Sequence, residues 1–246
     1  MRHREATGSH QPVIEQSLAP AVVLGPHGRI VSIRFCAPGE LRIRKIVQRS
    51  RFRMTIKFPS IKAKRMVECE SRNERNLCVL MEVDPKILRY EEQPCEVVYM
   101  VDGEEHYHYP DFLVHFADHK ELVEVKESAE AKEVQKRTDL LTEELPYYGF
   151  QYRVKMAEKF KKQPRLRVSE LVIKFGRRPI SQSEREFVRR LFLSTPALTW
   201  GSACAGEYSL YGRELLCRLV IEGVLAVDFN TPLSATTAFT LRRGAM

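Results

Sequence analysis

The chain has 246 residues and a mass of 28.5 kDa, which is enough for one large domain or two small ones. Its composition, 43% hydrophobic and 29% charged, excludes collagen-like and wholly disordered proteins. No apolar run approaches the roughly 18 to 20 residues of a membrane span, and the first residues lack the apolar stretch of a signal peptide, so we expect a cytoplasmic protein. The six cysteines form no Cys-x-x-Cys pair, which predicts reduced thiols rather than a disulfide framework or a zinc site.

The charge is positive and unevenly distributed. Forty Lys and Arg against thirty-two Asp and Glu give +8, which indicates a polyanionic partner, with nucleic acid first and an anionic membrane surface second. Residues 42–65 carry ten basic groups and no acid, whereas residues 66–126 carry fifteen acids and six bases, a net charge of −9. Those carboxylates would repel the phosphates of a nucleic acid, unless a bound cation neutralises them.

The basic run contains a strictly alternating stretch at residues 51–58, in which apolar and basic or polar side chains take turns. This alternation predicts a half-buried strand with a basic face. Such a face can simply be solvated, or it can follow a phosphate backbone, in which case counterion release makes binding salt-dependent.

The predicted elements begin after a loosely structured N-terminal arm at residues 1–41. Apolar spacing predicts a helix from Ser71 that ends at Asp84-Pro85, since proline does not continue a helix. The Asp102-Gly103 pair is a hairpin-turn signal between two β-rich stretches. Strands are predicted at 95–101, 106–109, 111–116, 122–126 and 150–156, and a charged amphipathic helix at 128–145. Residues 42–160 therefore read as a mixed α/β domain with a covered sheet.

A Lys- and Pro-rich linker at residues 159–165 predicts a boundary before a second domain at residues 165–246. Apolar spacing predicts helices at 183–193 and 210–222, with a short element at 199–205, and Gly223 ends the last helix. A small hairpin follows at 224–229 and 236–241. Three helices followed by a hairpin are typical of a mainly α, winged-helix-like domain.

The stretch most informative about chemistry combines Asp111 with Glu124-Val125-Lys126. The period of a strand puts Glu124 and Lys126 on one face and Val125 on the other, in the core. A carboxylate at the start of one strand can thus meet a carboxylate and an ammonium on its neighbour. This is the geometry of the PD-(D/E)xK nuclease site. The carboxylates offer hard oxygen ligands suited to Mg²⁺ or Mn²⁺, ions that promote the attack of water on a phosphodiester, while Lys126 can orient that water or stabilise developing charge.

A third carboxylate, Glu74, stands one turn into the predicted helix. It can point towards the strand ends as a ligand. The sequence Ser71-Arg-Asn-Glu74 is equally a capping box, in which the glutamate satisfies backbone amides. Glu70 is a competing ligand candidate, so both roles of Glu74 stay open on the residues alone.

These motifs together resemble the TnsA family, the endonuclease subunits of heteromeric cut-and-paste transposases. The family pattern is a Ser-x-x-Glu helix, a Leu-Glu stretch leading to Gln, an Asp-Phe-Leu-Val strand and a strand ending in Val-Lys. The matching residues here are Ser71 and Glu74, Met81-Glu82 through Ile87 and Gln93, Asp111–Val114, and Val125-Lys126. The resemblance covers residues 68 to 156 closely.

The resemblance implies a restriction-endonuclease-like fold followed by the winged-helix-like domain. It implies that Glu74 is the catalytic helix glutamate, Asp111 the central metal ligand and Lys126 the catalytic lysine, while Glu124 stands where members can carry glutamine. The implied metal ligands for Mg²⁺ or Mn²⁺ are Glu74, Asp111, Glu124 and Val125. The residues at the N-terminus differ from the family, so recognition of particular DNA ends does not carry over.

The resemblance also implies a setting. Family members act in bacteria, in the cytoplasm at the nucleoid, and hydrolyse phosphodiester bonds of double-stranded DNA at the 5′ ends of a transposon. A TnsB-like transposase cuts and joins the 3′ ends, and a TnsC-like AAA+ ATPase regulates the assembly. Two other functions fit the residues: a stand-alone restriction, phage or junction-processing nuclease, and a catalytically silent DNA-binding adaptor.

A zinc site built from the histidines near Asp111 is disfavoured. Alternation puts His106 and His108 on one face and His115 with Asp111 on another, so no closed tetrahedral set forms. We expect these histidines at the surface or facing DNA. Gln93-Pro94 reads as punctuation before a strand, and Trp200 reads as a packing residue.

Overall fold

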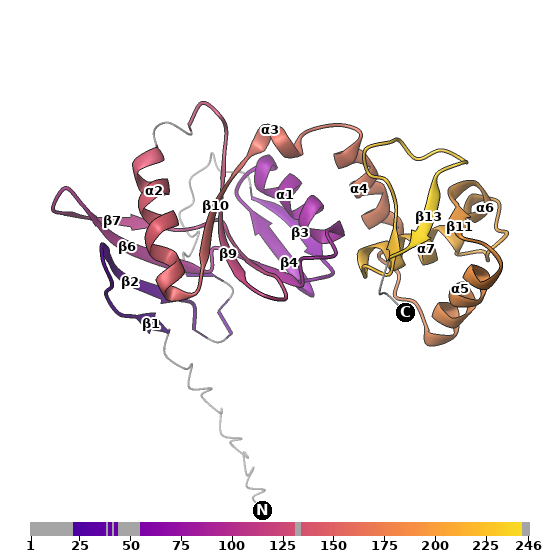
Figure 1. Cartoon of the computed structure of the whole chain (residues 1–246), viewed down its shortest axis with the longest axis horizontal. Helices are drawn as coiled ribbons and strands as arrows, with labels where there is room; N and C mark the ends of the chain where they lie inside the picture. The colour runs from indigo at the N-terminus through magenta and orange to yellow at the C-terminus, as the bar shows by residue number, and fades with distance from the viewer. Residues whose placement is uncertain (1–21, 38, 41, 44–54, 131–133, 243–246) are drawn as a thin grey trace, which may run out of the picture.

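The structure is a computed structural model that describes residues 22–37, 39–40, 42–43, 55–130 and 134–242. Its elements in chain order are β1 (Val23–Leu24), β2 (Ile30–Phe35), β3 (Ile56–Ser60), β4 (Arg65–Cys69), α1 (Arg72–Val83), β5 (Arg89–Glu92), β6 (Cys95–Val101), β7 (Glu104–His108), β8 (Phe112–His115), β9 (Lys120–Lys126), α2 (Gln135–Glu144), the 3₁₀ helix η1 (Leu145–Tyr148), β10 (Gln151–Met156), α3 (Ala157–Phe160), α4 (Arg165–Phe175), α5 (Gln182–Ser194), β11 (Ala197–Thr199), α6 (Trp200–Cys204), α7 (Gly212–Ile221), β12 (Leu225–Ala226) and β13 (Ala238–Leu241). This is a mixed α/β architecture, consistent with a nuclease-like fold (Figure 1).

The central sheet has the order β10-β9-β8-β5, with β10 parallel to β9 and the remaining pairs antiparallel. Alternate side chains of β9 enter two different hydrophobic clusters. Leu122 lies in the cluster shared with α2 and the sheet of β2 and β6, whereas Val123 lies in the cluster shared with α1. Both faces of the sheet are therefore covered, as the sequence predicts.

The second sheet has the order β1-β2-β6-β7 and lies on the α2 side of the molecule (Figure 1). Asp102 and Gly103 both have positive φ, 52° and 84°, which is the backbone of the tight hairpin turn predicted for this pair. The prediction that residues 1–41 form a loose arm is wrong for β1 and β2. A register shift between Ile30 and Ser32 brings Ile30 and Ile33 into the core at a spacing of three, which conceals the strand period.

Helix α1 is predicted correctly at both ends. Ser71 is its N-cap and accepts a hydrogen bond from the Glu74 amide, and Asp84 ends it. Within it, Glu82 is fully buried and its carboxylate accepts from Ser60 Oγ at 2.8 Å and Tyr90 Oη at 2.6 Å. It also accepts from the Ile61 and Lys62 amides, which fastens the β3–β4 turn to the helix. Glu82, which belongs to the acidic stretch at residues 66–126, thus has a structural role.

Two predicted elements differ from the structure or lie partly outside it. The helix predicted at 128–145 begins only at Gln135, after a turn in which the Glu130 amide donates to Glu127 O, and residues 131–133 lie outside the described part. Residues 51–54 of the alternating basic stretch, and 44–50 before them, also lie outside it. The remainder contributes to β3, where Lys57 is exposed and Phe58 is buried.

The C-terminal part continues the core of the sheet instead of standing apart from it. Phe160 and Leu166, within or next to the predicted linker, are buried in the same cluster as Val123 and residues of α4, α7 and β13. Helix α4 lies against α1 and α7, and β11-β13-β12 form a three-stranded antiparallel sheet beyond them (Figure 1). Trp200 packs between Phe175 and Phe239, which is the packing role its sequence position suggests.

All six cysteines are free thiols, as predicted. The closest described pair, Cys69 and Cys78, has its sulfurs 3.7 Å apart, far longer than the roughly 2.05 Å of a disulfide. None of the helices in the described ranges has both the length and the apolar character needed to cross a membrane.

Candidate active site

The strand register brings the predicted carboxylates together. Phe112 pairs with Val123, so Asp111, one residue before β8, lies across from Glu124 on β9. The Val125 amide donates a hydrogen bond to Asp111 Oδ2 at 2.7 Å, which fixes this carboxylate against the neighbouring strand. Glu124 and Lys126 share one face of β9, while Val125 packs against the cluster on the other, as alternation predicts.

Glu124 lies at the centre of the charged contacts. It is only 5% exposed, and its Oε1 is 2.9 Å from Lys126 Nζ and 3.4 Å from Arg137 Nη2 on α2. Its Oε2 lies 3.5 Å from His108 Nε2 and has no hydrogen-bond partner among the described residues. A buried carboxylate oxygen without a donor carries a large desolvation cost, which a bound cation would offset.

The pKa values at the site record crowding of negative charge. Burial, and then the charges of Glu124 and Glu74, raise the pKa of Asp111 well above its ordinary value. Burial also raises the pKa of Glu74, to which the nearby carboxylates Glu70 and Glu124 add. Partial burial opposes the charge of Lys126, but the hydrogen bond and attraction of Glu124 outweigh it and raise the pKa of this ammonium. A divalent cation among these groups would lower the carboxyl pKa values.

Glu74 serves as a cap in this structure. Its carboxylate accepts from Ser71 Oγ and from the Glu70 amide, both at 2.8 Å, and its own amide donates to Ser71 Oγ at 3.1 Å. Glu74 nevertheless lies near enough to Asp111 to shift its pKa. The side chain that would join a metal site is therefore held one turn into α1 by the hydrogen bonds of the capping arrangement.

The donor set suits a hard divalent cation, although the side chains do not form a closed site as they stand. Among the described residues, no three His, Cys, Asp or Glu side chains are arranged to hold a metal ion. The oxygens of Asp111, Glu124 and Glu74 are the hard donors that Mg²⁺ and Mn²⁺ take. The partnerless Glu124 Oε2 is the observation in favour of a cation, whereas the Glu74 carboxylate is occupied by its hydrogen bond to Ser71.

Other acidic and polar side chains near the strand ends have different partners. Glu143 and Glu144 both pair with Arg29, at 2.5 and 3.1 Å, rather than with the site. Gln93, with a positive φ of 43°, donates from Nε2 to Glu70 Oε1 at 2.6 Å, and its amide donates to the Asp111 carbonyl at 2.9 Å. It lies between β5 and β6, as its punctuating sequence suggests, and it borders the site.

The expectation that the histidines near Asp111 lie at the surface is wrong for His108. It is 5% exposed, its Nε2 lies 3.0 Å from Tyr152 Oη, and its ring packs edge-on against that tyrosine. Burial, and then the positive charges of Arg137 and Lys126, lower the pKa of His108 to about 3, so the imidazole is neutral at physiological pH. Alternation puts His108 on the same face of the strand as His106. It cannot reveal that His108, the last residue of β7, is buried while the residues before it are exposed.

Arg137 and Tyr152 were also missed by sequence reasoning. Arg137 sits on α2, 13 positions after Glu124, and nothing in this spacing ties it to Glu124. Tyr152 lies on β10, where pairing with Leu122 puts it on the face that Glu124 also occupies. Parallel pairing of β9 with β10 is the signal that would have identified Tyr152.

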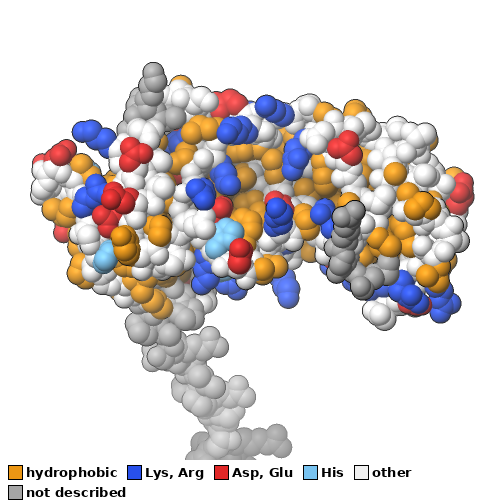
Figure 2. Space-filling model, in the orientation of Figure 1, with side chains coloured by type: hydrophobic (Ala, Val, Ile, Leu, Met, Phe, Trp, Pro, Cys, Tyr) orange, Lys and Arg blue, Asp and Glu red, His pale blue; other side chains and the backbone are white. Residues whose placement is uncertain are grey.

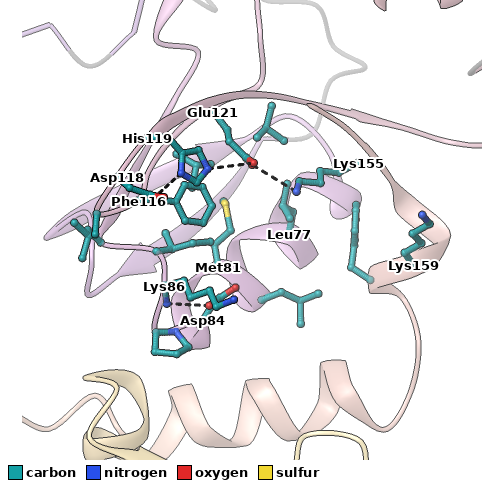
Figure 3. A pocket seen from close by; sticks show the side chains of 18 of the residues that line it. Leu77, Met81, Asp84, Lys86, Phe116, Asp118, His119, Glu121, Lys155 and Lys159 are labelled. Carbon is teal, nitrogen blue, oxygen red and sulfur yellow. Dashed lines mark hydrogen bonds and ion pairs between the residues drawn. The ribbon is translucent and has the colours of Figure 1, made fainter. Parts of the chain in front are cut away.

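A cavity of about 840 Å³ lies beside α1 and the strands β8, β9 and β10 (Figure 3). Apolar side chains such as Leu77 and Met81 of α1 line it, with Glu121 and Lys155 at the strand end. Glu121 lies 3.6 Å from both Lys155 Nζ and His119 Nε2. The odd-numbered positions of β9 line this cavity, whereas Glu124 and Lys126 face the other way, so it is separate from the candidate active site.

Comparison with known families agrees with the geometry. The sequence model described as "TnsA-like endonuclease N terminal" matches residues 84–170, which include Asp111, Glu124 and Lys126 but begin after Glu74. A comparison with curated proteins gives no match. The resemblance to the TnsA family is thus confirmed where three of the four predicted catalytic residues lie. Residues 84–170 thus match a TnsA-like endonuclease N-terminal domain, which supports a TnsA-like nuclease.

Proposed function

We propose that this protein is a metal-dependent DNA endonuclease that serves as the TnsA-like subunit of a heteromeric transposase. It would hydrolyse phosphodiester bonds at the 5′ ends of a transposon in bacterial cytoplasm. The observation that carries the proposal is the convergence of Asp111, Glu124 and Lys126 on one side of the β8–β9 pair, with Glu124 Oε2 buried and unpaired among the described residues. The family match over residues 84–170 supports the reaction class.

In this proposal Asp111, Glu124, Glu74 and the backbone of Val125 hold Mg²⁺ or Mn²⁺. When bound, such an ion supplies Lewis-acid polarisation of the phosphate and a lowered pKa of water. The protein's own part is positional. The Val125 amide orients Asp111, and Glu124 holds the Lys126 ammonium, whose raised pKa keeps it charged and able to stabilise negative charge developing on the phosphate.

A groove of about 310 Å³ next to α1 supports DNA contact. Phe58 and Val79 contribute to its floor, and four cationic side chains and one acid border it: Lys57, Arg75, Lys174, Arg177 and Glu170. Arg75, the residue after Glu74 on α1, lines this groove and pairs with Glu170 of α4. Lys and Arg also predominate over acids across the middle of the face in Figure 2. Such cations suit the backbone of duplex DNA.

The order of helices and strands in the C-terminal part supports a winged-helix-like assignment. The burial of its last helix, however, does not suit insertion into DNA. The sheet order β11-β13-β12, with α5 before β11 and α6 and α7 after it, is the arrangement expected of a winged helix. Helix α7, however, is buried along most of its length, including Leu215, Leu216 and Leu219. We therefore propose that this part supports the nuclease and binds partners or phosphate, without inserting α7 into a major groove.

The partners proposed from the family are a TnsB-like transposase, which would cut the 3′ ends, and a TnsC-like AAA+ regulator. Within such an assembly this chain would make only the 5′ cuts. A stand-alone nuclease would use the same site without partners.

The test is a nicking assay on supercoiled plasmid carrying transposon ends, with Mg²⁺ or Mn²⁺ and with EDTA. Wild type is compared with Asp111→Ala and Lys126→Ala. Two matched controls remove the same charges nearby: Asp118→Ala, whose side chain is 85% exposed, and Lys120→Ala at the exposed start of β9. With a co-expressed transposase present, we expect nicking only with metal, lost in the first two variants and retained in both controls.

The outcomes separate the alternatives. Cleavage that persists in Asp111→Ala and Lys126→Ala, or that persists in EDTA, contradicts the assigned site. Nicking by the purified chain alone, without a co-expressed transposase, favours a stand-alone nuclease. No nicking under any condition, with DNA binding intact, identifies a silent adaptor.

A further inference from the structure

Arg137 is a cation in contact with the candidate site that the nuclease motif does not include. It reaches Glu124 from α2, across from β9, and its Nη2 lies 3.4 Å from the same Oε1 that Lys126 Nζ approaches at 2.9 Å. Its side chain is 24% exposed, and its Nε is buried with no hydrogen-bond partner in the described part of the chain. Arg137 also interacts through its guanidinium with the side chains of Tyr99 and Tyr152, so the contact with Glu124 is long and is shared with two tyrosines.

Charge balance explains why a second cation stands here. After burial, the charge of Glu124 raises the pKa of both Asp111 and Glu74, and the charge of Glu74 adds to the rise at Asp111, so three carboxyl groups crowd one site. Lys126 offsets one charge, and Arg137 supplies the next. In the absence of a divalent cation, these two side chains are the positive charges in contact with Glu124.

A divalent cation and Arg137 would therefore meet at the same carboxylate. An ion that approaches Glu124 encounters a guanidinium already within hydrogen-bond reach of it, and like charges at such distances repel. Glu124 Oε2, which faces neutral His108, is the oxygen left for the ion.

We propose that Arg137 is a built-in counter-cation that pairs with Glu124 in the metal-free site and competes with the divalent cation for this carboxylate. This inference rests on the proposed function, since it assumes that Glu124 is a metal ligand. Arg137 thereby lowers metal affinity. When the carboxylate turns to the metal, the guanidinium is released at the site, where a DNA phosphate can receive it.

The experiment measures Mn²⁺ binding to the full chain without DNA, by calorimetric titration at pH 7.5. Arg137→Gln removes the charge, and Arg137→Lys keeps it. Lys136→Gln is the matched control, because it removes the same charge from the adjacent, exposed position on α2, whose side chain lines a separate cavity with Asp139 and Glu143. We expect about three- to tenfold tighter Mn²⁺ binding by Arg137→Gln and little change in the other two.

Weaker or unchanged Mn²⁺ binding by a folded Arg137→Gln protein overturns the inference, since a merely supporting arginine would leave the affinity equal or lower. Arg137→Met, which keeps the apolar stem, gives the same test if the glutamine variant does not fold. Failure of the proposed function looks different: neither wild type nor any variant binds Mn²⁺, and plasmid nicking is absent. Nicking that requires Mn²⁺, with equal affinities in all variants, rejects only the role of Arg137.

Discussion

The Val125 amide donates to Asp111 Oδ2 at 2.7 Å, so the backbone of one strand orients the carboxylate of the next. This bond is retained by any side chain that keeps an acceptor oxygen at position 111. The negative charge can therefore be removed without dismantling the β8–β9 edge, which allows the chemical role of Asp111 to be separated from its structural one.

Asp111→Asn is expected to abolish nicking while making the metal-free protein more stable. A carboxyl group whose pKa is raised on folding favours the folded state only while it is protonated. Its contribution is present below the unfolded pKa, about 3.9, and is lost as the pH rises through the higher folded value. At pH 7.5 in EDTA, thermal unfolding of Asp111→Asn should therefore occur a few degrees above wild type. A lower unfolding temperature contradicts this reading, and so does retained nicking.

Ser71→Ala and Glu74→Gln distinguish the two roles of Glu74. Ser71→Ala removes the cap and should cost about 1 kcal/mol in the free energy of unfolding, measured with urea, with nicking retained. Glu74→Gln keeps an oxygen that can accept from the Glu70 amide, so its stability loss should be smaller while its nicking falls at least tenfold. If nicking follows stability in both variants, Glu74 is a cap alone.

His108 should make folding sensitive to acid. Its pKa is about 3 in the folded protein and about 6.5 in an unfolded chain, so the unfolded chain takes up a proton first as the pH falls. Stability from this group is complete above pH 6.5 and is lost towards pH 3, by about 2 kcal/mol at pH 5. Urea unfolding of wild type and His108→Asn at pH 7.5 and 5 isolates the effect, because the variant lacks this loss. Parallel pH dependence in both proteins contradicts the prediction.

The groove beside α1 should contribute to DNA affinity through charge. In Lys57→Gln combined with Lys174→Gln, duplex DNA should bind more weakly, and the slope of log affinity against log salt should fall by about one for each lysine. Fluorescence anisotropy with a labelled duplex in EDTA measures this without cleavage. Lys120→Gln, outside the groove, should keep the wild-type slope. An unchanged slope in the double variant excludes the groove from the DNA path.

Local signals predicted the elements around the site well. Ser71 and Asp84 delimit α1, Asp102-Gly103 gives the β6–β7 turn, and strand period puts Glu124 and Lys126 on one face. These features depend on neighbours in sequence, where capping, turn geometry and alternation act directly.

Long-range relationships were the part that the sequence did not reveal. β2 was taken for a loose arm because its bulge spaces Ile30 and Ile33 irregularly and its partner β6 lies about 65 residues further along. Arg137 reaches Glu124 through the placement of α2, which only the packed structure defines. Nor does the sequence reveal that some carboxylates of the acidic stretch at residues 66–126 have structural partners, such as Glu82 with Tyr90 and Glu92 with Arg65.

The shared core that includes Phe160, Leu166 and Leu215 has a consequence for DNA processing. If the C-terminal part were joined to the nuclease by a flexible linker, the position of cleavage on a bound duplex could vary. Here α4 and α7 share a core with the sheet that carries Asp111, so cations on α4, such as Lys174, are held at a constant separation from Asp111. Under the proposed function, the distance along the DNA duplex between the phosphates bound by α4 and the active site would then set the cut position, rather than the bases at the cut.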